Sequence, residues 1–105
     1  MVTTVEEMKN ALREAGLENA GVGVIFPWGA KIVEVDGKKT LQPMTPEEYR
    51  RAVEEETGKM LTDEQVQTPR CAYATGGCVS QGCRQAGGRC SLYHGSGGFY
   101  CLCDH

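Results

Sequence analysis

Four apolar residues recur at helical spacing near the start of the chain: Val5, Met8, Leu12 and Ala15. Thr3 and Thr4 each stand three residues before a glutamate, Glu6 and Glu7, which is the arrangement of a capping box at a helix N-terminus. Gly16 follows the last apolar position, and glycine is typical just after a helix ends. The pattern therefore predicts a helix over about residues 4–15.

After this helix the pattern changes to the alternation that is typical of β-strands. Residues 21–26 are alternating and rich in β-branched side chains, and residues 31–35 and 38–41 have the same character. The Asp-Gly pair at 36–37 is a strong signal of a two-residue hairpin turn. Three strands are therefore predicted, the last two as a hairpin. Trp28 lies in a Pro-Trp-Gly turn between the first two strands, and we expect it to anchor a core rather than contact a partner.

A second helix is indicated by residues that suit its first turn. Thr45 is a typical N-cap, Pro46 suits the first helical position, and Glu48 completes a capping box. This helix is predicted to run to about Thr57, and residues 62–65 carry a further capping signal. The first part of the chain is thus predicted to be a small unit of order α-β-β-β-α.

All six cysteines lie in the last third of the chain: Cys71, Cys78, Cys83, Cys90, Cys101 and Cys103. Charge is divided in a similar way, because residues 1–69 carry eight Lys/Arg against thirteen Asp/Glu (8 − 13 = −5) and residues 70–105 carry three against one (3 − 1 = +2). We expect an acidic segment at 1–66, a linker at 67–70 and a cysteine-rich module at 71–105. The predicted fold class is α+β, and the module is expected to contain a short helix and a β-hairpin but little other regular structure.

The cysteine-rich module has no long apolar run, so disulfide bridges or a metal ion are expected to replace a large core. The connectivity stays open, because six cysteines can pair in many ways. We favour bridges over a metal, which implies an oxidising destination. No apolar stretch of a Sec-type signal peptide follows Met1. The prediction is secretion or export after synthesis in the cytoplasm.

A zinc site is the alternative use of the cysteines. Cys101, Cys103 and His105 place two thiolates and an imidazole within five residues, and these are ligands that suit Zn²⁺. No cofactor is expected if the cysteines form bridges. A zinc site would instead make the chain a cytoplasmic metal-binding or thiol-redox protein.

The segments 88–90 and 98–103, a G-x-C followed by a C-x-C, resemble defensin-like cysteine-stabilised peptides. The resemblance implies a helix that is clamped to the sheet by two cysteines four residues apart. Cys78 and Cys83 are five apart, which on a helix turns their side chains roughly 140° away from each other. The resemblance therefore covers the last third of the chain without its helix clamp.

The stretch from Cys78 through Cys90 to the closing C-x-C also resembles the middle of epidermal-growth-factor-like modules. Those modules close with a further cysteine after the C-x-C, a position that this sequence does not fill. Cys71 would have to replace it from the other end, which alters the topology that the resemblance implies.

The pairs Cys71/Cys78 and Cys83/Cys90 each have the spacing C-x6-C and resemble glycocin-type bacteriocins. In that family two helices are clasped by nested disulfides. Seven residues make two helical turns, so each pair would share one helix face. The resemblance implies an antimicrobial peptide with two short helices.

The leading functional hypothesis is a ribosomally made precursor of a disulfide-stabilised antimicrobial or toxin-like peptide. Residues 1–66 would act as a leader or pro-segment that engages a maturation or export protein. Residues 71–105 would reach a membrane or receptor target after cleavage near Pro69 and Arg70. We expect no enzymatic activity and no nucleic-acid partner.

The remaining alternative is an extracellular protein-binding module. Its contact surface would be the glycine-rich loop of residues 93–100. The candidate contact side chains are Tyr93, His94, Phe99 and Tyr100.

Overall fold

The structure, a computed structural model, describes residues 2–80, 90–95 and 97–103, without the side chain of Cys103. The elements in this part of the chain are α1 (Val5–Glu14), β1 (Ile25–Phe26), β2 (Ala30–Val35), β3 (Lys38–Pro43), α2 (Pro46–Thr57), α3 (Asp63–Gln67), β4 (Cys71–Ala74), β5 (Gly77–Ser80), β6 (Cys90–His94) and β7 (Gly98–Cys103). The predicted α+β class is confirmed.

Each helix begins at a capping box that the sequence predicts. The side chain of Thr4 accepts a hydrogen bond from the backbone N–H of Glu7 at 3.1 Å, and Thr45 and Thr62 cap α2 and α3 in the same way. At the other end of α2, Gly58 has a φ of 75°, the left-handed conformation that commonly ends a helix. Both long helices therefore lie within about one residue of their predicted ends.

The strands of the first part agree with the prediction except for the first one. The turn between β2 and β3 contains Asp36 and Gly37 with φ values of 52° and 79°, as a two-residue hairpin turn requires. The strand predicted over 21–26 is reduced to the two residues of β1. Gly21 and Gly23 adopt positive φ values of 71° and 81° and form a turn in place of extended backbone.

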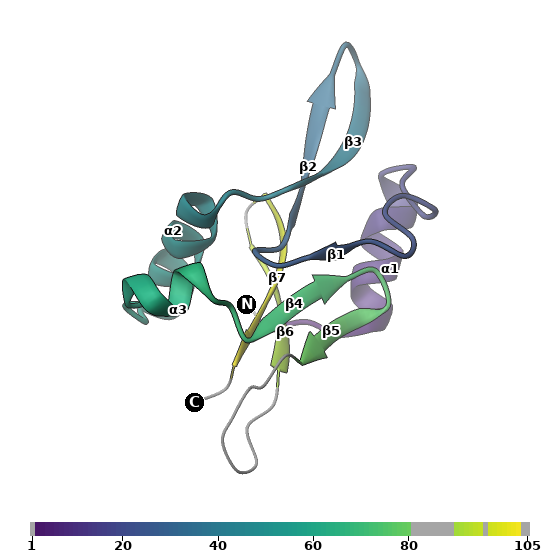
Figure 1. Cartoon of the computed structure of the whole chain (residues 1–105). Coiled ribbons are helices and arrows are strands. Elements are labelled where there is room, and N and C mark those ends of the chain that lie inside the picture. The colour runs from purple at the N-terminus through teal and green to yellow at the C-terminus, as the bar shows by residue number, and fades with distance from the viewer. Residues whose placement is uncertain (1, 81–89, 96, 104–105) are drawn as a thin grey trace.

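The strands form two antiparallel sheets, and each sheet contains strands from both ends of the chain. One sheet has the order β3-β2-β7-β6, and the other has the order β1-β4-β5. β2 pairs with β7 through Ala30 opposite Phe99 and Lys31 opposite Gly98, while β1 pairs with β4. The segments predicted as 1–66 and 71–105 are thus interleaved in both sheets, and the β2–β3 hairpin projects from one of them (Figure 1).

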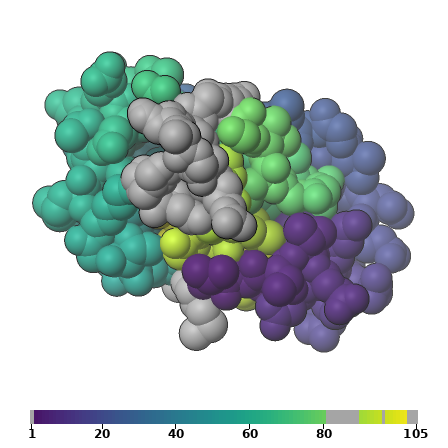
Figure 2. Space-filling view, turned by 90° about the horizontal axis from the view of Figure 1, so that it is seen from below, coloured from purple at the N-terminus to yellow at the C-terminus, as the bar shows by residue number. Residues whose placement is uncertain are grey.

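Strand β7 separates two hydrophobic cores because its side chains alternate between the two faces of the sheet. Phe99 and Cys101 point into the α1-side core, which also contains Met8, Leu12, Leu17, Phe26, Ala30, Cys71, Tyr73 and Leu92. Tyr100 and Leu102 point into the α2-side core, which also contains Met44, Tyr49, Val53, Leu61 and Val66. In Figure 2 the α2–α3 region and the N-terminal helix accordingly lie on opposite sides, with β6–β7 visible between them.

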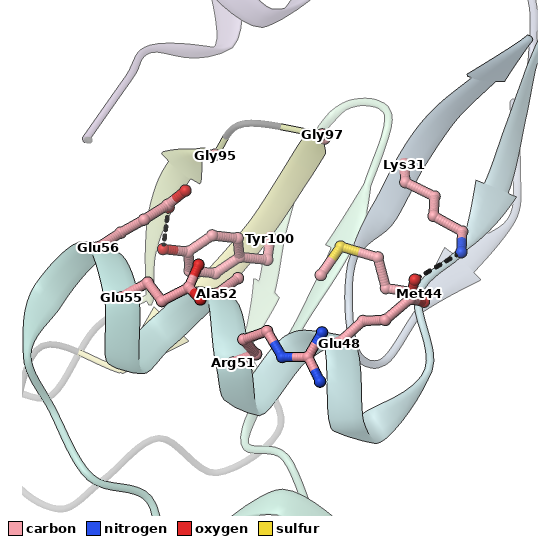
Figure 3. A pocket seen from close by; sticks show the side chains of 11 residues that line it. Lys31, Met44, Glu48, Arg51, Ala52, Glu55, Glu56, Gly95, Gly97 and Tyr100 are labelled. Atoms are coloured by element: carbon pink, nitrogen blue, oxygen red, sulfur yellow. Dashed lines mark hydrogen bonds and ion pairs between the residues drawn. The ribbon is translucent and has the colours of Figure 1, made fainter.

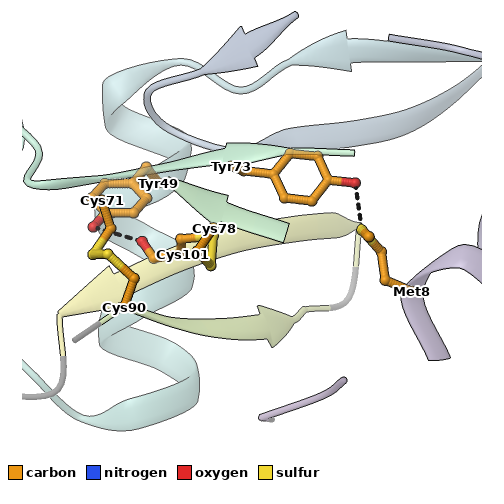
Figure 4. Close-up of a disulfide and its surroundings, with 7 residues drawn as sticks. All are labelled: Met8, Tyr49, Cys71, Tyr73, Cys78, Cys90 and Cys101. Carbon is orange, nitrogen blue, oxygen red and sulfur yellow. Dashed lines mark hydrogen bonds between the residues drawn. A yellow bond between two sulfur atoms is a disulfide. The ribbon is translucent and has the colours of Figure 1, made fainter. Parts of the chain in front are cut away.

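Within the described residues, two disulfides join the two sheets. Cys71 of β4 is bonded to Cys90 of β6, and Cys78 of β5 is bonded to Cys101 of β7, with Cα–Cα distances of 5.8 and 5.9 Å. The bridges lie against the α1-side core, where Tyr73 donates its hydroxyl hydrogen to the Met8 sulfur at 2.9 Å (Figure 4). The expected disulfide bonding is therefore confirmed for four of the six cysteines.

The cysteine-rich module is more regular than the sequence predicts. Its described residues form two β-hairpins, β4–β5 and β6–β7, and contain none of the expected short helix. The stretch 71–78, which the glycocin resemblance would make helical, belongs to β4, β5 and their turn. In the expected linker, Gln67 is the last residue of α3, and the preceding Val66 is buried in the α2-side core.

Within the described residues, no helix is both long enough and apolar enough to cross a membrane.

Candidate ligand pocket between α2 and the β6–β7 turn

A pocket of about 170 Å³ lies between helix α2 and the turn that connects β6 to β7 (Figure 3). One wall is a single face of α2 with residues at helical spacing: Glu48, Arg51, Ala52, Glu55 and Glu56. The opposite wall consists of Gly95, Gly97, Gly98 and Tyr100, and Lys31 and Met44 complete the lining. Residues from both ends of the chain are therefore needed to form it.

The elements around the pocket fix the positions of its walls. The capping box at Thr45 sets the start of α2, and Val53 and Tyr49 bury the adjacent face of this helix in the α2-side core. The aromatic rings of Tyr49 and Tyr100 meet edge to face, with centroids 6.0 Å apart. The other wall is held by the hydrogen bond from the Gly95 N–H to the Gly98 oxygen at 2.8 Å. The pocket is thus formed by regular elements and a short turn.

Glycine at position 95 allows α2 to approach this turn. A Cβ atom there would lie 2.5 Å from a carboxylate oxygen of Glu56, so a larger residue would displace that side chain. Glu56 in turn accepts a hydrogen bond from the Tyr100 hydroxyl at 2.7 Å. The turn and the helix therefore meet through the Glu56 carboxylate at one end of the pocket.

At the other end of the pocket a lysine and a glutamate form an ion pair. The Lys31 ammonium lies 2.7 Å from Oε2 of Glu48. This hydrogen bond, and a second from the backbone N–H of Thr45, hold the pKa of Glu48 below its ordinary value. Burial and the hydrogen bond to Glu56 raise the pKa of Tyr100 far above its ordinary value.

The remaining two charged groups of the pocket have no such partner. Arg51 and Glu55 make no ion pair or hydrogen bond with any residue that the structure describes. They are one helical turn apart, and their side chains line the pocket from α2 (Figure 3). The pocket therefore presents one cation and one anion that a ligand can neutralise.

The volume of the pocket limits the size of its occupant. Pockets for drug-sized ligands are typically about 300–1,000 Å³, well above this one. An engineered cavity of about 150 Å³ in another protein accommodates benzene. The pocket therefore suits a group of roughly the size of one amino-acid side chain or a small metabolite.

The predicted contact residues of the loop 93–100 do not lie together on one exposed surface. Phe99 and Tyr100 are almost fully buried, at 0% and 1% exposure. Tyr93 stacks on Tyr100 with centroids 5.4 Å apart, and His94 stacks on Phe99 at 4.4 Å, on the opposite face of the hairpin. Of these side chains, only Tyr100 lines the pocket, whereas the glycines of the loop supply its backbone wall.

The predicted cleavage residues lie between α3 and β4. Pro69 is half-buried and Arg70 is exposed, directly before the first residue of β4. Cleavage there would leave β1 and β2 hydrogen-bonded to β4 and β7.

The alternative zinc ligands are not assembled in the described residues. Cys101 is bonded to Cys78, which removes its thiolate from the proposed set of Cys101, Cys103 and His105. His105, Cys83 and the side chain of Cys103 lie outside the described part. No group of three His, Cys, Asp or Glu side chains within that part is placed to hold a metal ion.

Sequence reasoning missed Lys31, Arg51 and Glu55 as candidate site residues. Within the acidic run at 54–56, Oε1 of Glu54 lies 3.9 Å from Nε of Arg50 on the surface of α2. Glu55 and Glu56 instead face the turn of residues 95–98, which is about forty positions away in the sequence. No local pattern marks that approach.

Comparison with protein-family models, with curated proteins and with solved structures gave no significant match.

Proposed function

We propose that this chain acts uncleaved, as a disulfide-stabilised binding domain of an oxidising compartment, with its ligand held in the pocket between α2 and the β6–β7 turn. The observation that carries the proposal is the joint construction of that pocket. Lys31, Met44 and α2 come from the first part of the chain, and Gly95 to Tyr100 come from the cysteine-rich module. A site built in this way works only while the two parts stay together.

The disulfides support an oxidising location. Thiols in the cytosol are kept reduced, whereas disulfides persist in secreted proteins and in extracellular or periplasmic spaces. The two bridges connect the sheets at the edge of the α1-side core, so they are part of the folded architecture. Export after synthesis follows from this requirement and is part of the proposal.

The pocket chemistry favours binding over catalysis. A general acid or base works best when its pKa lies near the operating pH. The pKa of Glu48 is shifted downward and that of Tyr100 upward, so each shift moves the group further from neutrality. These shifts keep the carboxylate charged and the phenol neutral, which suits fixed contacts to a ligand.

A precursor of an antimicrobial or toxin-like peptide is the second candidate function. The exposed Arg70 between α3 and β4 favours it, since cleavage after this residue would place every cysteine in one product. Release of that product requires the β1–β4 and β2–β7 pairs to separate. It would also expose Phe99, Tyr100 and Leu102, which are now buried between the two parts.

Intact mass spectrometry of protein isolated from its natural source separates the two candidates. The binding domain is expected at full length, lighter by at least the four hydrogens of two bridges than after reduction. A dominant product that begins at residue 71 would refute the binding-domain proposal in favour of the precursor.

The ligand site is tested by filling it. The Ala52→Trp variant places an indole in the pocket, and Thr40→Trp places one on the exposed edge strand β3 as a control. Thermal-shift screening with a library of small metabolites is expected to find ligands that stabilise the wild type and Thr40→Trp but not Ala52→Trp. Equal stabilisation of all three proteins would show that the ligands bind elsewhere.

A further inference from the structure

The pocket combines one ion pair and one hydrogen-bonded carboxylate with two charges that have no partner in the described residues. Lys31 is paired with Glu48, and Glu56 accepts the Tyr100 hydroxyl, so these contacts are already made. Arg51 and Glu55 are left facing the cavity. Resting on the proposed binding function, we propose that the ligand is a free α-amino acid with an apolar side chain, whose carboxylate binds Arg51 and whose ammonium binds Glu55.

The placement of the two charges suits the two groups of an α-amino acid. Residues four apart on a helix have Cβ atoms about 5–6 Å from each other. Arg51 and Glu55 nevertheless form no ion pair within the described structure. The ammonium and carboxylate of an α-amino acid are joined through a single carbon, so both can lie between these side chains at the same time.

The hydrogen-bonding capacities also match. The guanidinium is a planar fork of N–H donors that binds a carboxylate through two parallel hydrogen bonds. The carboxylate of Glu55 accepts hydrogen bonds from the three N–H groups of an ammonium. One ligand therefore neutralises both free charges of the pocket.

The apolar surface of the pocket favours a hydrophobic side chain on the ligand. Met44, at 8% exposure, Ala52 and the ring of Tyr100 form this part of the lining (Figure 3). A methionine side chain adapts its shape to different apolar neighbours. The volume of about 170 Å³ restricts the choice to residues such as valine, leucine or methionine.

The overall charge of the lining disfavours other small ligands. Lys31 and Arg51 supply two positive charges against three carboxylates, at Glu48, Glu55 and Glu56, so the lining carries a net charge of 2 − 3 = −1. Phosphates and dicarboxylates would be repelled by this excess, and a simple amine would leave Arg51 without a partner. A zwitterion avoids both penalties.

The test is calorimetric and NMR titration of the full-length, oxidised protein with L-leucine and three analogues. Leucinamide lacks the carboxylate, N-acetyl-leucine lacks the ammonium, and glycine lacks the apolar side chain. We expect L-leucine to bind with a Kd of about 1 mM or tighter. Leucinamide and N-acetyl-leucine should each bind at least about tenfold more weakly because one charged contact is lost. Glycine should bind at least about tenfold more weakly because the burial of the apolar side chain is lost.

Two charge-removing variants and two controls complete the design. Arg51→Gln and Glu55→Gln are expected to weaken leucine binding at least about tenfold, because each removes a charge-assisted hydrogen bond. Glu47→Gln in the first turn of α2 and Lys39→Gln on β3 each remove one exposed charge that does not line the pocket, and they are expected to leave the affinity unchanged. Thermal unfolding of each variant confirms that the exposed substitutions leave the fold intact.

Three outcomes would overturn the inference. One is binding of leucinamide or N-acetyl-leucine as tight as that of leucine, and another is unchanged affinity in Arg51→Gln. The third is the absence of leucine, valine and methionine binding while another metabolite stabilises the wild type but not Ala52→Trp. This third outcome would leave the proposed binding function in place, whereas equal stabilisation of wild type and Ala52→Trp by all ligands would refute both.

Discussion

Removal of the disulfide between Cys78 and Cys101 measures how much this bridge contributes to the free energy of unfolding, and so how far bridges substitute for a larger hydrophobic core. The perturbation is the double variant Cys78→Ala/Cys101→Ala, which leaves the Cys71–Cys90 bridge in place. Substitution of both partners avoids an unpaired thiol that would exchange with the remaining bridge. The bridge spans 23 residues, so its loss restores to the unfolded chain an entropy equivalent to about 3.4 kcal/mol at 25 °C.

The matched variant Cys71→Ala/Cys90→Ala provides an internal comparison. Its bridge spans 19 residues, for which the same relation predicts about 3.2 kcal/mol. Each variant also loses the packing of one almost fully buried sulfur, Cys101 or Cys71, at 1% and 2% exposure, which adds about 1 kcal/mol. The two variants are therefore expected to be destabilised almost equally.

The two bridges are not expected to act independently. Their loops overlap over residues 78–90, so the first bridge already restricts part of the chain that the second one closes. A domain of this length has a free energy of unfolding of about 5–15 kcal/mol. Each single bridge removal should leave a folded protein, and removal of both should cost less than the sum of the two effects.

The assay is equilibrium unfolding in urea, followed by circular dichroism and by fluorescence. Trp28 is the only tryptophan, and its Nε1–H donates to the backbone oxygen of Val66 at 2.7 Å, so its emission reports on the α2-side core. With a slope of about 1–3 kcal/mol/M, a total loss of about 4 kcal/mol should lower the midpoint by about 1.4–4.4 M urea. A loss below about 1 kcal/mol in either variant would refute the chain-entropy reasoning. A difference above about 2 kcal/mol between the variants would show that packing dominates.

Three further predictions concern the interior of the fold. Gly29→Ala should lower the free energy of unfolding, measured in urea, by about 2–4 kcal/mol, since φ at this position is +91° and the new Cβ would lie 2.5 Å from the Phe99 carbonyl oxygen. An unchanged free energy of unfolding would contradict that close approach. Trp28→Phe should lower the free energy of unfolding by about 1 kcal/mol, because it removes the hydrogen bond from the indole N–H to the Val66 oxygen in α3. An unchanged urea midpoint would show that this bond contributes no net stability. Burial raises the pKa of Tyr49 and Tyr73 to about 12, so these phenols ionise at a lower pH in the unfolded chain and the free energy of unfolding should fall as the pH rises from about 10 through 12. Tyrosinate absorbance and circular dichroism should therefore change together in this pH range. Ionisation of all tyrosines near pH 10 without unfolding would contradict the prediction.

The elements near the N-terminus could be predicted because their signals are local. The capping boxes at Thr4 and Thr45 and the Asp-Gly turn at 36–37 each lie within four residues of sequence, and each is found in the structure. Trp28 was expected to anchor a core, and its hydrogen bond to α3 at the edge of the α2-side core agrees with that expectation. These features depend on short-range hydrogen bonds and on local backbone conformation, and both can be predicted from neighbouring residues in the sequence.

The arrangement of the cysteine-rich module could not be predicted because it depends on distant partners. The run from Phe99 to Leu102 is continuously apolar, and such a run indicates a strand that is buried on both faces. The sequence therefore indicates a buried strand, but it does not indicate which elements cover its two faces. One face packs against α1 and β4, and the other packs against α2, which begins more than fifty residues earlier. The disulfide pairing follows from that packing and not from the spacing of the cysteines.

The stability of the fold and the proposed ligand binding both depend on strand β7, and this determines which substitutions can separate the two. Tyr100 is a wall of the pocket, and its neighbour Cys101 carries the bridge to β5. A substitution of either residue would change the core and the pocket together, so a loss of binding would not identify a contact. Arg51 and Glu55 line the same pocket from the exposed face of α2 and have no partner in the described residues whose loss would destabilise the fold. Their substitution would therefore change the charges that the proposed ligand meets while β7 and the bridges Cys71–Cys90 and Cys78–Cys101 stay as they are. This makes α2 the side from which the proposed site can be tested.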